Sequence, residues 1–319
     1  MPPPTAPLRT VAALAAALVL LPACDAARGT DEPPDVPPQT FDDTPVPFEL
    51  AIHDTPRLTF SLFNTGFQGS WRGNQSGQAF ALDGVNGLYE GQLLIAASEA
   101  QVSGSPYPPA IEDWSWTEGS RLTELRDVGA FDGGYRTRFA DAGPGDAEAI
   151  GVTVTQRAYV GAAAEGAAVL VYDVRNDGPD RDGLYVGLFA DFDVFVPAPN
   201  DAGFDAATQT VYTFDPSDGT PYHFGVRAVS HPLSGWSVDL PGGAATEDAL
   251  LYAPLTTPGT ISPLTDTTDR RTVIGAGPFA LASGATQRVA FAYVAGASRA
   301  EMLAAADAAA TAYDSVAGF

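Results

Sequence analysis

Short runs with an apolar residue at every second position recur between about residues 48 and 297. Clear examples are Leu58-Phe60-Leu62, Ile150-Val152-Val154 and Val289-Phe291-Tyr293. Successive side chains of a β-strand point to opposite faces of the sheet, so this spacing predicts strands with one buried face. Two further runs, 169–174 and 184–194, are apolar at nearly every position. They predict central strands that are covered on both sides.

Turn signals separate these runs. They are Asn86-Gly87, Asp132-Gly133-Gly134, Asn176-Asp177-Gly178-Pro179 and Asp218-Gly219. Glycine and asparagine tolerate the positive φ that tight turns require. We expect the strands near 149–160, 166–176 and 183–194 to form an antiparallel meander. We expect residues 48–297 as a whole to fold as one all-β domain, a large antiparallel β-sandwich.

A helical pattern follows at 298–316. Ser298 and Glu301 have the spacing of a capping box, and an alanine-rich segment comes after them. Leu303, Ala306 and Ala310 share one face of this helix. We expect a short C-terminal helix packed on the sandwich, because a helix that binds a partner would need larger apolar anchors.

Residues 1–23 have the features of a secretory signal peptide. Eleven apolar residues, Val11 to Leu21, follow a leader with one arginine. This run is about half of the ~20 residues that a membrane-spanning helix needs. The sequence Leu21-Pro22-Ala23-Cys24 resembles the lipobox of bacterial lipoproteins, in which the cysteine is lipidated and becomes the first residue. The resemblance implies an exported protein anchored to a membrane of the cell envelope through Cys24.

One residue departs from the usual lipobox pattern. Pro22 stands where lipoboxes usually have a small residue. The alternative is an ordinary secretory peptide that is cut after Ala23, with an incidental cysteine. Cys24 is the single cysteine of the chain, so it forms no internal disulfide, and no cysteine-based zinc site exists.

Residues 24–47 predict an extended tether behind the lipid. Six prolines and six acids lie between Asp25 and Pro47. A segment of this composition does not bury enough apolar surface to fold, and proline favours the polyproline II conformation. At about 3.1 Å per residue the tether would span roughly 70 Å.

The charge balance narrows the list of partners. The chain has 39 acidic residues against 16 basic ones, all of them arginine, and a net charge of −23. Binding to nucleic acid needs clustered positive charge, so nucleic acid is not expected as a partner. Adaptation to high salt and a GC-rich genome explain the acidity equally well, and neither indicates a function.

The residues Val169 to Asn176, followed by Gly183 to Asp193, resemble a β-rich domain that recurs in secreted and surface proteins of bacteria. That domain sometimes lies beside subtilisin-like protease domains. The stretch Gly87 to Gly91 is also similar. This resemblance implies an extracytoplasmic β-sandwich without assigned catalytic residues, and this chain has Phe192 where relatives often carry tryptophan between two acids.

The best candidate for a metal site is Asp191-Phe192-Asp193. Residues two apart on a strand point the same way, so Asp191 and Asp193 would present two carboxylates on one face. Asn200 and Asp205, in the segment that follows, would add further oxygen atoms. Hard oxygen ligands suit Ca²⁺, which takes six to eight of them. The alternative is that an acidic protein places Asp and Asn in loops, where they cap turns.

A second candidate is Trp114-Ser115-Trp116, flanked by acidic residues. On a strand, Trp114 and Trp116 would share a face, and exposed aromatic rings of this kind bind sugars by stacking. The alternative is that both rings fill a core or cover a sheet edge, which is the usual place of tryptophan.

Signals for a hydrolase are weak. The chain has three histidines, His53, His223 and His231, and lacks both the Gly-x-Ser-x-Gly and the His-Glu-x-x-His motifs. A Ser/His/Asp triad is set by geometry, so sequence alone does not test it. Two hypotheses follow. The first is a membrane-tethered binding or scaffolding module for a surface glycan or another envelope protein, stabilised by Ca²⁺. The second is an extracytoplasmic hydrolase that acts on glycans through an acid pair.

Overall fold

A computed structural model of the chain describes most residues from Glu49 onward. The described ranges are 49–69, 78–104, 114–117, 119–126, 128–141, 149–195, 199–216, 222–240, 247–265 and 269–318. They belong to one compact unit, Gln39–Phe319. The leader, Cys24 and the whole of the tether lie outside the described residues. Within the described ranges, no helix is both long and apolar enough to cross a membrane.

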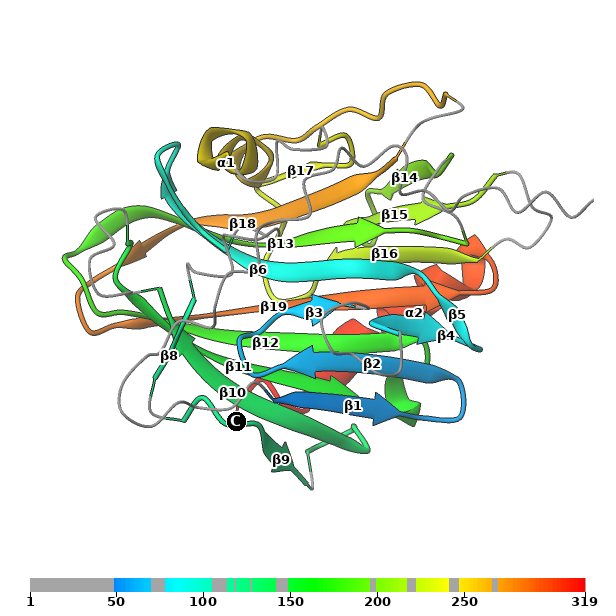
Figure 1. Ribbon diagram of the computed structural model, residues 1–319, viewed down its shortest axis with the longest axis horizontal. Helices are drawn as coiled ribbons and strands as arrows, with labels where there is room; N and C mark the ends of the chain where they lie inside the picture. Colours follow the sequence, from blue (N-terminus) through cyan, green and yellow to red (C-terminus); the bar gives the residue numbers. More distant parts are fainter. Residues whose placement is uncertain are drawn as a thin grey trace, which may run out of the picture. The chain divides into compact units, whose positions relative to one another are not determined.

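One layer of the domain is a nine-stranded antiparallel sheet (Figure 1). Its strands lie in the order β14 (Asp201–Asp205), β15 (Thr210–Phe214), β16 (His223–Ala228), β19 (Thr286–Gly296), β12 (Ala167–Asn176), β11 (Val152–Val160), β10 (Gly133–Ala140) and β8 (Ser115–Trp116). The ninth strand, β9 (Thr123–Leu125), also pairs with β10. A 3₁₀ turn, Ala162–Ala164, connects β11 to β12.

Two smaller antiparallel sheets form the facing layer. The four-stranded sheet has the order β1 (Leu50–Asp54), β2 (Leu58–Phe63), β4 (Phe80–Leu82) and β5 (Val85–Asn86). The six-stranded sheet has the order β17 (Gly235–Ser237), β18 (Arg271–Leu281), β13 (Arg181–Phe192), β6 (Leu88–Ser98) and β3 (Gln68–Gly69), and β7 (Gln101–Ser103) also pairs with β6.

The main hydrophobic core lies between the two layers. Every member of the three alternating runs belongs to it, from Leu58 on β2 to Tyr293 on β19. Burial of these apolar faces is the main favourable contribution to folding. The domain is therefore a large antiparallel β-sandwich of the all-β class, as the spacing predicted.

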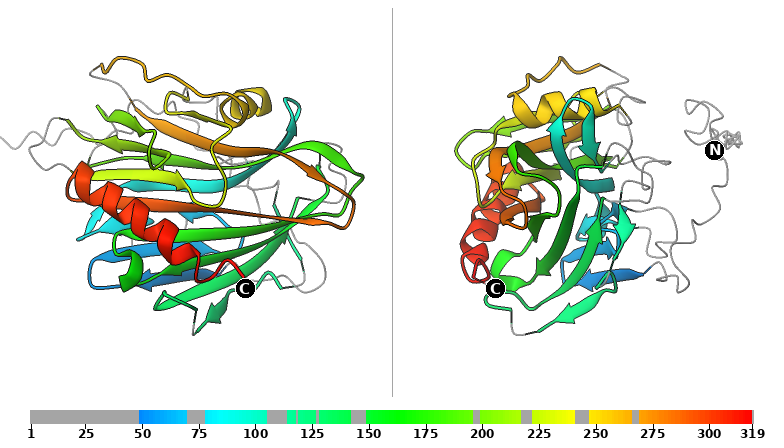
Figure 2. Two further views of the ribbon diagram at one scale, coloured as in Figure 1. Left: turned by 180° about the vertical axis from the view of Figure 1, so that it is seen from behind. Right: turned by 90° about the vertical axis from the view of Figure 1, so that its left-hand side faces the viewer.

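Two helices cover the outer faces of the layers. The C-terminal helix α2 (Arg299–Tyr313) lies across the nine-stranded sheet, and Val169 and Val171 of β12 pack against it (Figure 2). The helix α1 (Asp248–Thr256) covers the six-stranded sheet, where Phe189 of β13 contacts it. Both continuous apolar runs thus lie on strands that are covered on both sides.

The sequence did not predict α1, which is short and contains Pro254. Gly187 of β13 and Gly275 of β18 lie opposite each other beneath it. A side chain at either position would collide with Leu255 of α1. The bare backbone of these two glycines therefore lets the helix approach the sheet closely.

The predicted meander is correct for its first two strands and wrong for the third. β11 pairs with β12, but β12 takes β19 as its other neighbour, and β13 lies in the six-stranded sheet. The side chain of Asn176 holds the connection between the layers. Its Nδ2 donates to the carbonyl oxygens of Pro179 (2.7 Å) and Leu281 (2.9 Å). Because both strands are apolar on both faces, the pattern alone did not specify their neighbours.

The predicted cap of α2 is present, whereas its buried face differs from the expected one. Ser298 Oγ accepts a hydrogen bond from Glu301 N (3.2 Å), and Glu301 Oε2 accepts from Ala297 N (3.1 Å). Leu303 and Ala310 are only half-buried. The fully buried residues are Met302, Ala305, Ala306, Ala309 and Ala312. These small side chains let the helix lie close to the sheet.

Candidate functional site

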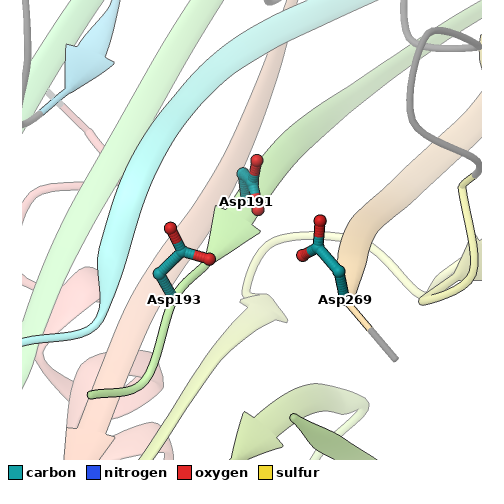
Figure 3. A group of neighbouring side chains, drawn as sticks. All are labelled: Asp191, Asp193 and Asp269. Carbon is teal, nitrogen blue, oxygen red and sulfur yellow. The ribbon is translucent and has the colours of Figure 1, made fainter. Parts of the chain in front are cut away.

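Three carboxylates converge at one end of the six-stranded sheet. Asp191 is the second-to-last residue of strand β13, Asp193 follows that strand, and Asp269 precedes β18. One oxygen atom from each of the three lies within 4.8 Å of the others. Figure 3 shows the three side chains turned toward a shared space. Asp191 and Asp193 are two of the predicted ligands, whereas no pattern in the sequence pointed to Asp269.

Strand register places Asp191 between two charged neighbours. It pairs with Glu90 of β6 on one side and Arg271 of β18 on the other. Asp191 shares its face of the sheet with Phe189, while Phe192 points into the main core. Asp191 is 3% exposed and Glu90 is fully buried. The cluster therefore lies on the outer face of the six-stranded sheet.

Arg271 connects two of the three carboxylates. Its Nε lies 3.4 Å from Asp191 Oδ2, and its NH2 lies 2.7 Å from Asp269 Oδ2. Three carboxylates and one guanidinium leave a formal charge of about −2 at neutral pH. A divalent cation would balance this charge, and carboxylate oxygens are the ligands that Ca²⁺ prefers.

The neighbouring Arg270 is fully buried and holds the segments around the cluster together. Its guanidinium pairs with Asp239 and lies 3.6 Å from Asp201 Oδ1. It also donates to the carbonyl oxygens of Asn200 (3.2 Å) and Ser262 (2.8 Å). The guanidinium of Arg270 therefore contacts three segments: the loop that leads into β14, the residues after β17 and the segment before β18.

Asn200, another predicted ligand, lies just before β14, and its side chain forms a local hydrogen bond. Its Oδ1 accepts a hydrogen bond from Val194 N at 3.2 Å. This bond joins the two ends of the segment that connects β13 to β14. Asn200 thus supports the strand end that carries Asp191 and Asp193.

Asp205 lies at the opposite end of β14 from Asp201, about 13 Å away at 3.3 Å per residue. Its Oδ1 accepts from Thr208 N (2.9 Å), and Arg299 lies 2.9 Å from its Oδ2. The hydrogen bond from Thr208 and the charge of Arg299 hold the pKa of Asp205 below its usual value. Asp205 therefore anchors α2 and does not belong to the group of three carboxylates.

An exposed aromatic ring lies close to the carboxylates along the chain. Phe195 is 43% exposed, and its φ of 63° is unusual for a bulky residue. Its ring meets the edge of Tyr222 with 5.9 Å between the centroids. Only Val194 separates Phe195 from Asp193, so their Cα atoms are at most about 7 Å apart.

The two predicted tryptophans do not form an exposed pair, because Trp114 is buried. Trp114 is 3% exposed, and its ring packs edge-on against Phe139 with 5.0 Å between the centroids. A buried ring of this kind offers no face to a sugar. Trp116 lies on β8, and its side chain falls outside the described part of the structure.

The three histidines show no catalytic triad among the described residues. His53 is buried, and His223 stacks on Phe214 with 4.8 Å between the centroids. His231 Nδ1 lies 2.8 Å from Ser230 Oγ. Burial lowers the pKa of His231. Its other ring nitrogen meets the amide of Gln287 at 3.5 Å, so no described carboxylate completes a Ser/His/Asp arrangement.

Comparison with known proteins gives distant structural likenesses alone. No protein-family model and no curated protein matches the chain. A protein from Escherichia coli K12 proposed to be an aldose 1-epimerase is similar over 78% of this chain and 99% of its own, with 10% identity and a TM-score of 0.46. The Slr1438 protein of Synechocystis sp. PCC 6803 is similar over 81% and 99%, with 9% identity and a TM-score of 0.46.

A heparan sulfate lyase, HepC from Pedobacter heparinus, is similar over 75% of this chain and 33% of its own, with 7% identity and a TM-score of 0.36. These values are too low for the likeness to bear on function.

Proposed function

We propose that this protein is an exported lipoprotein, anchored to a membrane of the cell envelope through Cys24, whose β-sandwich serves as a binding module. The apolar leader, the lipobox-like Leu21–Cys24 and the proline-rich tether 24–47 support the anchor. A lipoprotein carries at least two acyl chains, which is enough for stable attachment. The tether would hold the sandwich away from the membrane surface.

The mass of the native amino terminus tests this placement. We expect the mature protein to begin at Cys24 and to carry lipid, and a Cys24→Ser variant to leave the membrane fraction. Retention of Met1, or an unmodified thiol at Cys24 in the mature product, would contradict the anchor.

The convergence of Asp191, Asp193 and Asp269 is the observation that carries the binding function. These residues would hold Ca²⁺ through their carboxylate oxygens, with Arg271 fixing two of them in place. Ca²⁺ takes six to eight oxygen ligands, so several positions would remain for water or for hydroxyl groups of a ligand. Asp193 and Asp269 are only half-buried, so a ligand could approach their carboxylates from solvent.

The ligand that fits this site best is a neutral surface glycan. A sugar presents hydroxyl groups, which hydrogen-bond to carboxylates and coordinate Ca²⁺, and an apolar ring face, which would stack on Phe195. The chain carries a charge of −23, so it repels anionic polymers. Phe195 would thus take the role considered for Trp114 and Trp116 as candidates.

Calorimetric titration with Ca²⁺ tests the metal site in the full-length protein. We expect a dissociation constant of about 10⁻⁴ to 10⁻³ M, typical of extracellular modules with few ligands. Asp193→Asn and Asp269→Asn should each weaken binding about tenfold, since affinity follows the number of charged ligands. Asp205→Asn is the matched control, because Asp205 lies at the other end of β14, and its variant should bind Ca²⁺ normally.

A glycan array with Ca²⁺ and with chelator tests the ligand. Phe195→Ala should lose glycan binding and keep Ca²⁺ binding, whereas Leu250→Ala, with similar exposure on α1, should keep both. If the protein bound no neutral glycan on the array, the proposal of a glycan ligand would be wrong. The proposed Ca²⁺ site would not be affected by that result. Release of smaller products, lost in Asp193→Asn, would instead support a glycan hydrolase that uses an acid pair.

A further inference from the structure

Four polar side chains form a ring inside the otherwise apolar core. Gln156 of β11, Tyr172 of β12 and Tyr293 of β19 come from the nine-stranded sheet, and Gln68 of β3 comes from the facing layer. All four are fully buried. Polar groups in such a place cost free energy unless hydrogen bonds compensate for the water that they lose.

Contacts connect the members of this ring. Gln156 and Tyr172 are direct partners in the β11–β12 register, which brings their Cβ atoms to about 5 Å. Tyr293 donates a hydrogen bond to Gln68 Oε1 at 3.0 Å. Gln68 Nε2 in turn donates to the carbonyl oxygen of Gly66. A Cβ on Gly66 would lie 2.6 Å from Gln156 Oε1, so this backbone closes the ring.

The two tyrosines are also close enough to influence each other. Burial raises the pKa of Tyr172, and the nearby Tyr293 raises it further. Burial raises the pKa of Tyr293 as well. Both phenols are therefore neutral at physiological pH, and the ring contains no ionised group.

Three atoms of the ring lack a hydrogen-bond partner among the described residues. They are Oε1 and Nε2 of Gln156 and the hydroxyl of Tyr172. Nearly all buried polar atoms of native proteins are bonded to protein or to ordered water. A donor, an acceptor and a hydroxyl that can do either therefore lie at neighbouring positions of β11 and β12, without a partner among the described residues.

We propose that this ring holds ordered water, a buried hydration site between the layers. Water both donates and accepts, and an enclosed water typically makes about three hydrogen bonds, which matches the three open atoms. The absence of charge in the ring argues against an ion. Complete burial of all four side chains argues against an organic molecule.

The site ties the segment 63–69, which links the four-stranded sheet to the six-stranded sheet, to the nine-stranded sheet. The bond between Gln68 and Tyr293 is one direct connection. Thr137 Oγ1, which donates to Asn64 O at 2.7 Å, is another. Water bonded to Gln156 and Tyr172 would complete this attachment.

Water-to-protein NOE measurements on the full chain, with a high-resolution crystal structure, test the proposal. We expect water contacts at the side-chain amide of Gln156 and at Tyr172. Tyr172→Phe should remove one partner of the water and lower Tm by about 2–4 °C. Tyr172→Phe with an unchanged or raised Tm would overturn the proposal, because an unbonded hydroxyl costs nothing to remove. An empty space in the wild-type crystal structure would overturn it independently of any variant.

Discussion

Arg270→Met is expected to lower the free energy of unfolding by roughly 3–5 kcal/mol, the usual cost of removing one partner from a buried ion pair. Arg270 is fully buried and binds two carboxylates and two carbonyl oxygens. Methionine fills similar space but removes the guanidinium that donates to Asp239 Oδ1 and to the carbonyl oxygens of Asn200 and Ser262. Urea unfolding at pH 7 measures the change.

The same variant should weaken the proposed Ca²⁺ site, because Arg270 holds the segments on either side of the carboxylates. Arg175→Met is the matched control. Its ion pair with Asp177 is about half-exposed, so the stability should change by no more than about 0.5 kcal/mol. A loss below about 1 kcal/mol for Arg270→Met would show that the network contributes little net stability.

Acid is expected to destabilise the domain through His53. Burial lowers the pKa of His53 from 6.5 to about 4, and its ring packs against Phe60 and Tyr135. The unfolded chain binds a proton at His53 near pH 6.5, whereas the folded chain does so only near pH 4. The contribution of His53 to the free energy of unfolding is therefore fully present above pH 6.5. About 3 kcal/mol of it is lost as the pH drops to 4.

Comparison with His53→Phe isolates this contribution. Burial raises the pKa of Asp141, which stabilises the fold in acid. Hydrogen bonds from Arg288 and Arg157 outweigh burial and lower the pKa of Asp173, which destabilises the fold in acid. Both groups are present in the wild type and in the variant, so the difference between the two pH profiles reports on His53 alone. If the free energies of unfolding of the wild type and the variant changed in parallel between pH 7 and 4, the folded protein would accommodate a charged imidazole at His53.

The sandwich could be predicted because its signal is local. Leu58, Phe60 and Leu62 alternate because one face of β2 lies on the core, and that pattern needs no knowledge of neighbours. The order of strands depends on contacts between distant segments. Nothing in the run 184–194 distinguishes β12 from β18 as its neighbour, and the helix α1 depends on Gly187 and Gly275, which come from different strands.

In the candidate site, too, local sequence patterns identified some residues and contacts between distant segments placed the others. Asp191 and Asp193 were recognisable because they are close in sequence at the end of an apolar strand. Asp269 joins them only because β18 pairs with β13. Asp205 was grouped with them by proximity in sequence, but β14 carries it away toward Arg299. Phe195 has a weak sequence signal, since one aromatic residue after an apolar strand is common.

The pairing of β12 with β19 has a consequence for the order in which the sheet forms. It joins Ala167 to Val294 and Arg175 to Thr286, segments more than a hundred positions apart. The centre of the nine-stranded sheet therefore forms only after the chain has been made as far as residue 296. Sheets built from such distant pairs fold slowly. For the proposed exported lipoprotein this delay would be useful, because translocation machinery acts on unfolded chains and β12 has no partner on the β19 side until residue 296 is made.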